Sequence, residues 1–193
     1  MFLLRRPSAD FVRQFINNQS NLPFSYSDVG ATATRAPGGY RVDHNRVKLG
    51  AGFETYQRAV TALKEWRQFD IGWVRIVPPG TLLADGAVVA VEAKALGLWS
   101  LNAARVVYMI DDKGDMKARF GFAYGTLPHH VEEGEERFSV EWQPDDSVWY
   151  DIYAFSRPQH RLAKMGFPFV RMLQKQFAKD SMAAMAAATR ATA

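Results

Sequence analysis

Three stretches of the chain carry apolar side chains three and four positions apart, which is the period of an α-helix with one apolar face. They are residues 8–16, 53–66 and 168–177. Ser8 is the expected N-cap of the first helix, because its hydroxyl can accept a hydrogen bond from the first turn. Pro168 is the expected first-turn residue of the third, where a proline sacrifices no hydrogen bond. The pattern therefore predicts a short N-terminal helix, a middle helix and a C-terminal helix.

Elsewhere the apolar residues alternate with polar ones or form short β-rich runs, which predicts strands. The predicted strands are 40–49, 73–77, 87–96, 105–111, 117–126, 137–143 and 148–155. Turn sequences at 112–115 and 144–147 join successive strands with no helix between them. Such an order is typical of an antiparallel meander. A change of phase within the first strand predicts a β-bulge near His44 or Asn45.

This order of elements predicts an α+β fold in which a curved antiparallel β-sheet grips a long C-terminal helix. Phe169, Leu173 and Phe177 form the apolar side of that helix, and the concave face of the sheet is the large apolar surface available to them. We therefore expect these three side chains to be buried. The basic residues of the opposite side are expected to be exposed, namely Arg171, Lys175 and Lys179. In its element order the chain resembles the START and birch-pollen-allergen-like helix-grip superfamily.

The length of 193 residues fits a single domain, 1–193. Residues 1–39 would form an N-terminal helix and loop that are peripheral additions to this domain. Residues 40–182 would form the helix-grip-like body. Residues 183–193 are rich in alanine and offer little to bury, so we expect this tail to fray.

The composition is that of a folded protein, because 48% hydrophobic and 13% aromatic residues are too many for a disordered chain. The absence of cysteine excludes a disulfide framework, a thiolate metal site and a cysteine nucleophile. No apolar run reaches the roughly eighteen residues typical of a transmembrane helix. Arg5 and Arg6 come too early for the apolar region of a secretory signal. We therefore expect a cytoplasmic protein.

The net charge of +4 is unevenly distributed along the chain. The segment from Arg157 to the end carries seven basic residues and one acidic one, so the remainder of the chain is slightly acidic. Proteins that bind polyanions usually spread basic and aromatic residues over a whole face. We read the C-terminal charges as a solvated helix face and expect neither a nucleic acid nor a membrane as partner.

The densest polar segment runs from Gly121 to Phe138. We expect a strand to end at Tyr124, a loop to follow, and the next strand to begin near Arg137 and Phe138. The loop would hold two histidines and four glutamates, which are His129, His130, Glu132, Glu133, Glu135 and Glu136. Crowded carboxylates repel one another, so burial of this loop would raise the pKa of at least one of them.

We expect this segment to be ordered and to fold back on the body of the protein. At least one of Glu132, Glu135 and Glu136 is then expected to pair with Arg157 or with another internal base. A metal is not expected, because a zinc site needs at least three protein ligands and His130 with Glu132 would supply two. No cofactor-binding motif is present in the sequence, and we expect no cofactor.

Several segments resemble the family called domain of unknown function nineteen-ninety. They are Phe24-Ser25-Tyr26 through Val29-Gly30-Ala31-Thr32, Gly39-Tyr40-Arg41, Leu49-Gly50-Ala51-Gly52, Ala154-Phe155-Ser156-Arg157-Pro158 and Leu162-Ala163-Lys164-Met165-Gly166. The most specific part is the string Tyr124-Gly125-Thr126-Leu127-Pro128 with His130, Glu132, Gly134-Glu135-Glu136 and Phe138. The resemblance covers roughly residues 3–185. One departure is His129, where a glycine is expected. The family has no established activity, so the resemblance supports the fold and marks a place to look for a site.

The sequence favours a small-molecule-binding module with an apolar pocket between the sheet and the C-terminal helix. Its ligand would be an apolar or amphipathic molecule that the sequence does not identify. The candidate binding residues are Trp66, Tyr124, Thr126, His130, Glu132, Glu136, Trp149 and Arg157.

Two alternatives remain open. On the same scaffold, an enzyme would use His130 and one loop glutamate as acid and base on a carbonyl-containing ligand. A surface-docking protein would instead use the ridge of Arg171, Lys175 and Lys179 on an anionic surface. The sequence does not choose among these, nor does it give the oligomeric state.

Overall fold

The structure is a computed structural model that describes residues 1–114, 118–159 and 167–190. Its helical elements are α1 (Ala9–Gln19), η1 (Ala31–Ala33), α2 (Phe53–Lys64), η2 (Arg67–Phe69) and α4 (Phe167–Ala188). Its strands are β1 (Phe2–Leu3), β2 (Arg41–Ala51), β3 (Val74–Val77), β4 (Val88–Ala95), β5 (Leu98–Lys113), β6 (Ala118–Thr126), β7 (Glu132–Trp142) and β8 (Ser147–Pro158). None of the helices in these ranges has the length and hydropathy required to cross a bilayer.

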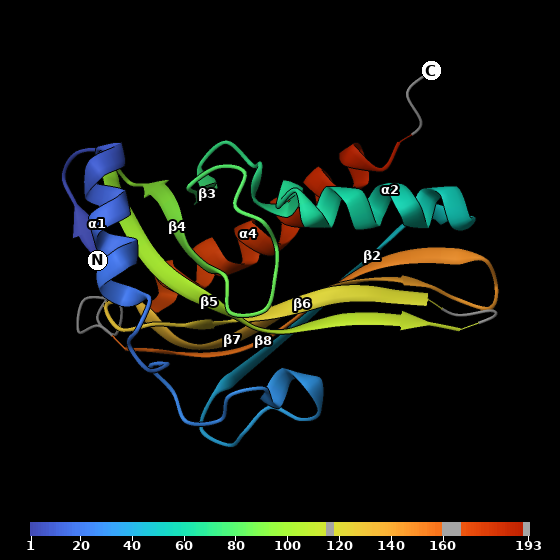
Figure 1. Cartoon of the computed structure of the whole chain (residues 1–193), viewed down its shortest axis with the longest axis horizontal. Helices are drawn as coiled ribbons and strands as arrows, with labels where there is room; N and C mark the ends of the chain where they lie inside the picture. The colour runs from blue at the N-terminus through green and yellow to red at the C-terminus, as the bar shows by residue number, and fades with distance from the viewer. Residues whose placement is uncertain (115–117, 160–166, 191–193) are drawn as a thin grey trace.

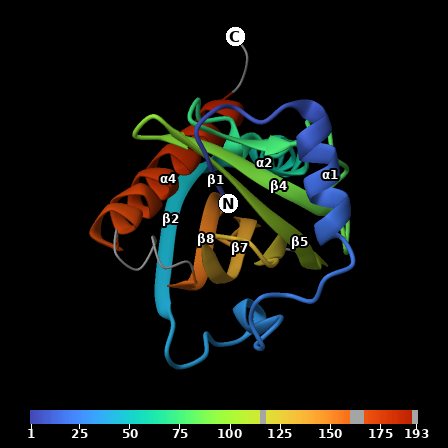
Figure 2. The same ribbon diagram turned by 90° about the vertical axis from the view of Figure 1, so that its left-hand side faces the viewer.

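The strands form one antiparallel sheet in the order β2-β8-β7-β6-β5-β4-β3, with β1 paired to β5. The sheet curves, and α4 crosses its concave side (Figures 1 and 2). Helix α2 lies on the same side, over the far end of the long strands (Figure 1). The predicted α+β fold, a curved antiparallel sheet gripping a C-terminal helix, is therefore confirmed.

The main core lies between the concave face and the helices. Side chains at alternate positions of β6, β7 and β8 fill it, because a strand presents every second residue to one face. The fully buried members at its centre are Phe122, Phe138, Tyr150 and Ile152. A smaller second core forms where α1 packs on the outer face of β4 and β5 through Val12 and Phe15. As predicted, the Ser8 hydroxyl caps α1 by accepting from the Phe11 N–H.

Helix α4 is held more firmly near its end than the sequence indicates. Residues 183–193 were expected to fray; 191–193 lie outside the described residues, but over the rest of this tail α4 continues to Ala188, and Met185 is completely buried in the main core. The Thr189 hydroxyl donates to the Met185 carbonyl at 2.9 Å and closes the last turn. The expectation failed because a single apolar residue among small ones is enough to seat a helix end when the small ones allow close approach.

The other half of α4 also differs from expectation. Phe169, Leu173 and Phe177 are half-buried, not buried, because they line a hollow between the helix and the sheet, although the Phe177 ring also packs against Phe138 of β7. Lys175 and Lys179 are exposed as expected, whereas Arg171 is half-buried and pairs with Asp43 on β2.

Strand boundaries depart from the prediction at three places. The bulge in β2 lies between Lys48 and Gly50, not near His44 or Asn45. Strand β5 begins at Leu98, seven residues before the predicted 105. The turn predicted at 112–115 lies partly outside the described residues, and its first two residues belong to β5.

The largest difference concerns the acidic segment. Strand β7 begins at Glu132, so the connection from β6 is only 127–131 and all four glutamates belong to a strand. The acidic residues had suggested a solvated loop between Tyr124 and Phe138. The structure instead satisfies their backbone groups through ladders with β6 and β8.

The segment between α1 and β2 lies against the convex face of the sheet (Figure 1) and is anchored there by Glu135. This carboxylate is 2% exposed and accepts from the Tyr26 hydroxyl at 2.6 Å, the Gly30 N–H at 2.7 Å and the Thr32 N–H at 2.9 Å. The Thr32 hydroxyl also donates to it. Burial and the neighbouring carboxylate raise the pKa of Tyr26, so the phenol keeps the proton that it donates.

Gly125 gives the Tyr26 ring room to reach Glu135. It is the cross-strand partner of Glu135, and a Cβ at Gly125 would lie 2.2 Å from the Tyr26 hydroxyl oxygen. Position 125 therefore requires a glycine, because the Tyr26 side chain approaches its backbone too closely for a Cβ.

Replacing Met185 with alanine tests the packed end of α4. We expect Met185→Ala to lower the free energy of unfolding by about 2–5 kcal/mol, as other large-to-small core substitutions do. The matched control is Met172→Ala on the same helix, where the side chain is 55% exposed and the change should stay within about 0.5 kcal/mol. Urea denaturation measures both, and equal values for the two variants would contradict a packed helix end.

The Gly125–Tyr26 approach predicts a non-additive pair of substitutions. Gly125→Ala should destabilise the protein by about 1–3 kcal/mol, because the new methyl group displaces the Tyr26 ring. In a Tyr26→Ala background the same substitution should be nearly neutral, since the space is then free. A double-mutant cycle by thermal or urea denaturation provides the measurement, and strict additivity would show that the two side chains do not compete for this space.

Candidate functional site

A cavity of about 650 Å³ lies between the concave face of the sheet and the N-terminal half of α4. Residues of α4, β2, β8, β7, β6, β5 and β4 line it, and several of these elements surround the centre of the view in Figure 2. Its apolar wall includes Phe69, Trp73, Ile152 and Phe177, and the Phe177 ring packs on Phe69 with a centroid distance of 5.3 Å. The end of the cavity away from this apolar wall is polar.

Small side chains on the central strands create this hollow. Neighbouring positions on β7 and β8 carry Phe138 beside Ile152, and this pair fills the space beneath the helices. Two residues further along β8 stands Ala154, and beyond it Ser156 lies beside Gly134. Because these three residues fill little of the space below α4, apolar contact between the sheet and the helix is incomplete there.

The alternation of β7 divides its four acidic residues between the two faces of the sheet. Glu132 and Glu136 point into the cavity. Glu133 forms an ion pair with Arg157, and Glu135 binds the N-terminal segment on the convex face. The four glutamates therefore form two groups. Glu133 and Glu135 make structural contacts on the convex face, and Glu132 and Glu136 border the cavity.

Glu136 carries an unusual carboxyl group. Its Oε2 accepts from the Tyr124 hydroxyl at 2.9 Å, and Tyr124 is its cross-strand neighbour on β6. Burial raises the pKa of Glu136 to about 7, and the charges of Glu132 and Asp43 add to this effect. Burial likewise raises the pKa of Tyr124, which therefore remains a donor. Near neutral pH the Glu136 carboxyl group can thus gain or lose a proton.

Glu132 is bound by a neutral group from α4. The Gln174 side-chain amide donates to its Oε2 at 2.6 Å and lies 3.2 Å from the Ser156 hydroxyl. Burial raises the pKa of Glu132 above its ordinary value, although these hydrogen bonds oppose the shift. The guanidinium of Arg171 is close by but makes a two-pronged ion pair with Asp43. Arg171 was expected on the exposed ridge, and its engagement with Asp43 corrects that expectation.

His130 is uncharged in this structure. Its Nδ1 accepts from the Glu132 N–H at 3.1 Å, and burial lowers the pKa of His130 to about 3. The imidazole thus orders the turn that leads into β7. At the preceding position His129 has φ +67°, a left-handed conformation that glycine adopts without strain. This conformation explains why a glycine is expected there in the resembled family.

Five of the eight candidate residues line the cavity, namely Tyr124, Thr126, His130, Glu132 and Glu136. Three do not, which corrects their placement. Trp149 and Arg157 are on the convex side because they occupy odd positions of β8, where Trp149 lies under Arg46 and Arg157 over Tyr40. Trp66 is buried in the main core, where its indole N–H donates to the Thr81 carbonyl at 2.8 Å.

The prediction that one of Glu132, Glu135 and Glu136 pairs with Arg157 or another internal base is also wrong. The segment is ordered against the body of the protein, as expected. Among the described residues, however, Glu132, Glu135 and Glu136 bind hydroxyl, amide and backbone N–H groups, and Arg157 pairs with Glu133. Strand alternation would have identified this partner, since residues 133 and 157 face the same side.

Sequence reasoning missed the cavity residues that come from distant segments. Asp43, Asn102 and Gln174 all line the cavity, and Asn102 orders the turn by accepting from the Val131 N–H at 3.2 Å. The available signal was the pair of polar residues Asp43 and Asn45, which lie two residues apart on the same side of β2 as the apolar Val47.

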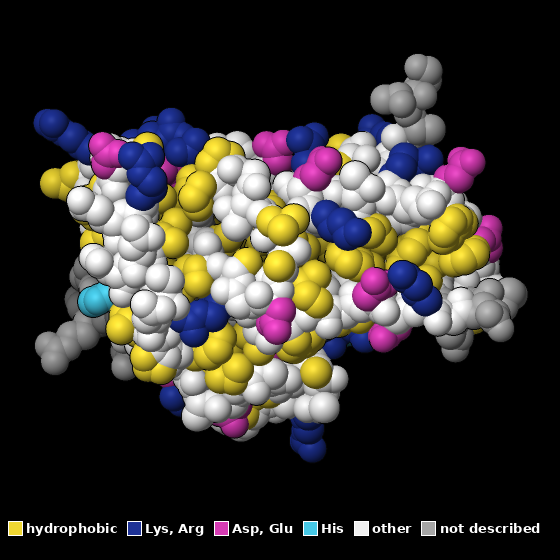
Figure 3. Space-filling model, viewed as in Figure 1, with side chains coloured by type: hydrophobic (Ala, Val, Ile, Leu, Met, Phe, Trp, Pro, Cys, Tyr) yellow, Lys and Arg dark blue, Asp and Glu magenta, His cyan; other side chains and the backbone are white. Residues whose placement is uncertain are grey.

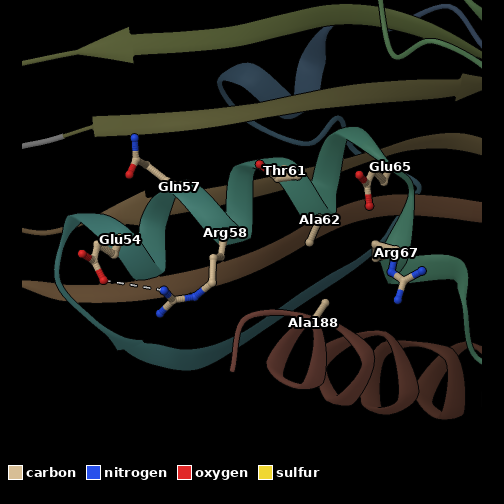
Figure 4. A pocket seen from close by; sticks show the side chains of 8 residues that line it. All are labelled: Glu54, Gln57, Arg58, Thr61, Ala62, Glu65, Arg67 and Ala188. Carbon is tan, nitrogen blue, oxygen red and sulfur yellow. Dashed lines mark ion pairs between the residues drawn. The ribbon is translucent and has the colours of Figure 1, made fainter. Parts of the chain in front are cut away.

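A second hollow, of about 640 Å³, lies between α2 and the end of α4 (Figure 4). Its side chains are largely in solvent: Glu54 is 90% exposed and Arg58, its ion-pair partner, 36% exposed. Arg58 also donates to the Thr189 carbonyl at 2.9 Å and ties the two helices together. We therefore interpret this groove as the junction where α2 and α4 are tied together, and not as a binding site.

Comparisons with known proteins agree with this architecture. The family model described as Domain of unknown function (DUF1990) matches residues 25–184. A UPF0548 protein of Dictyostelium discoideum is 38% identical over 199 residues, which cover 94% of this chain and 92% of that protein. A crystal structure of a hypothetical protein from Helicobacter pylori is similar with a TM-score of 0.53 at 16% identity, covering 80% of this chain and 91% of the other. The structure of Ara h 8.0201 is similar at a TM-score of 0.44 and 11% identity, covering 76% and 98%.

The raised pKa of Glu136 predicts a stability difference that depends on pH. Its value is about 7 in the folded protein against 4.5 for an ordinary glutamate, so the folded state binds this proton more tightly. Wild-type stability is therefore lost through this group as pH rises from about 4.5 to about 7. Glu136→Gln cannot ionise and avoids this loss. We expect the variant to match the wild type near pH 4 and to exceed it by about 1–3 kcal/mol near pH 8.

Urea denaturation of both proteins across this pH range provides the measurement. The shifts of other groups, including that of His130, largely cancel in the difference between the two curves. A difference that does not change with pH would show that Glu136 titrates as an exposed glutamate does.

Proposed function

This chain belongs to the DUF1990 family, and we propose that it is a binding protein for a small amphipathic molecule held in the cavity under α4. The apolar part of the ligand would lie against Phe69, Ile152 and Phe177. Its polar end would meet Glu132 and Glu136. The ligand would complete the packing that the small side chains of β7 and β8 leave open.

The observation that carries this proposal is the coincidence of a large cavity with convergent polar groups at one end. Small-molecule sites are concave, mostly apolar and about 300–1,000 Å³ in volume, with a few polar groups that fix orientation. The cavity of about 650 Å³ lies within that range. Tyr124, Gln174 and Asn102 approach its polar end from three different elements.

Enzymatic activity is a second candidate function, in which Glu136 and not His130 would act as the acid or base. An acid or base works best when its pKa is near the working pH, and the pKa of Glu136 is about 7. The pKa of His130 is lowered to about 3, and its Nδ1 is already occupied by the Glu132 N–H. The expected pair of His130 with a glutamate therefore lacks support, and a catalytic role would fall to Glu136 with Tyr124.

Docking to an anionic surface has less support than the cavity. Of the ridge residues, Arg171 is committed to Asp43, which leaves Lys175 and Lys179 exposed. On the face seen in Figure 3, acidic and basic side chains are interspersed over α2 and the nearby surface. That mixture does not form a field of one sign that would attract a polyanion.

Filling the cavity tests the binding proposal. Nile red is a neutral apolar dye whose fluorescence rises when it leaves water. We expect it to bind the wild-type protein in a one-to-one complex, and Ala154→Phe to weaken this binding about tenfold or more, because the new ring occupies the floor of the cavity.

The control is Ala183→Phe, which adds the same ring at an exposed position of α4 and should leave dye binding unchanged. Circular dichroism establishes that both variants fold. Equal dye binding by Ala154→Phe and the wild type would place the dye elsewhere and remove the support for a binding cavity.

A further inference from the structure

We infer that the ligand carries a cationic nitrogen, an ammonium group on an apolar body, which is placed between the cavity-facing carboxylates of Glu132 and Glu136. This inference rests on the proposed function, because it names the chemical class that the cavity selects. The cavity is the site, and the two carboxylates set the charge that its occupant must have.

The charged and titratable groups around the polar end come from each element that packs there. They are the N-terminal amino group of Met1, which donates to the His129 carbonyl, Asp43 on β2, Tyr124 on β6, His130 on the turn, Glu132 and Glu136 on β7, and Arg171, Lys175 and Lys179 on α4. Asp43 and Arg171 neutralise each other through their ion pair. His130 is uncharged, and its pKa of about 3 keeps it so at neutral pH. Burial lowers the pKa of the Met1 amino group to about 6, so it is mostly uncharged near pH 8. Near that pH, Asp43, Arg171, His130 and the Met1 amino group thus bring little net charge to compensate the glutamates.

Among the residues that the structure describes, the hydrogen-bond donors to the two glutamates are neutral. Glu136 is bound by the Tyr124 hydroxyl and Glu132 by the Gln174 amide. Within the described ranges, no ion pair joins a lysine or arginine to either carboxylate. Lys175 and Lys179 are exposed at the outer rim, where their ammonium groups keep their hydration. Within the part of the chain that the structure describes, the cavity therefore has two acidic groups without a matching base.

Charge complementarity then decides among ligand classes. An anionic ligand would face two like charges in a poorly solvated space, which is unfavourable. A neutral ligand would exclude the remaining water and leave the carboxylates uncompensated. An ammonium group would donate charge-assisted hydrogen bonds to them, and these are about twice as strong as hydrogen bonds between neutral groups.

Proton binding supplies a second expectation. Without a cation, the pKa of Glu136 is about 7 and that of Glu132 is also raised, so a proton provides part of the missing positive charge. An ammonium ligand favours the ionised carboxylate and displaces that proton. Its affinity should therefore increase as pH rises from about 5.5 to about 8, whereas a carboxylate ligand should show the opposite trend.

Three molecules with the same apolar chain and different head groups test the inference. Calorimetric titration of the full chain with n-octylammonium, n-octanol and n-octanoate is carried out near pH 5.5 and pH 8. We expect n-octylammonium to bind about tenfold more tightly than n-octanol near pH 8, with n-octanoate weakest. Its advantage over n-octanol should shrink near pH 5.5.

Three substitutions identify the groups responsible. Glu136→Gln and Glu132→Gln should each remove most of the ammonium preference while n-octanol binding persists, which also shows that the cavity is intact. The matched control is Glu133→Gln on the same strand, where the side chain faces the convex side and pairs with Arg157. This control should retain the preference.

The outcomes separate the inference from the function beneath it. Equal affinity for n-octylammonium and n-octanol near pH 8, or a preference that survives both cavity substitutions, overturns the cationic class and leaves a binding cavity in place. Failure of all three molecules to bind, together with failure of the dye, overturns the binding function itself.

Discussion

The buried carboxylate of Glu135 determines which side chains of β7 face the convex side of the sheet and which face the cavity. Four donors from Tyr26 and the 30–32 segment surround it on the convex face, so a register in which it faced the cavity would leave it without partners. Because side chains alternate along a strand, fixing this one residue fixes the face of every other residue in β7. Glu132 and Glu136 are then directed to the concave side, which is where α4 and the cavity lie.

The cavity combines two features that each reduce stability. Ala154, Ser156 and Gly134 leave space that larger side chains could fill, and unfilled volume in a core is destabilising. Glu132 and Glu136 place carboxylates in that space, where burial raises the pKa of both and their hydrogen-bond partners among the described residues are neutral. Proteins commonly depart from good packing and charge balance at functional sites. The coincidence of both departures at one place is the physical reason to assign function to this cavity and not to the groove beside α2.

The sequence supports most of the fold because local patterns specify it directly. The helical spacing around Phe15, the alternation through Phe122 and Phe138, and the apolar side of α4 all predicted elements that the structure contains. The acidic segment was misjudged because its composition suggested solvent, whereas pairing with β6 and β8 is a tertiary effect. The missed residues Asp43 and Gln174 are distant in sequence, and only the β2–β8 pairing and the crossing of α4 bring them to Glu132.

The two halves of α4 are held in different ways, and this difference bears on how a ligand would be retained. The second half packs directly on the core through Ala178 and Met185, and Ser181 lies 3.0 Å from the Tyr150 hydroxyl. The first half is joined to the sheet by polar contacts, from Arg171 to Asp43 and from Gln174 to Glu132. Apolar contact beneath Leu173 and Phe177 is incomplete because the cavity lies there. A ligand in the cavity would supply that contact, so its binding energy and the docking of the first half of α4 would be two aspects of one equilibrium.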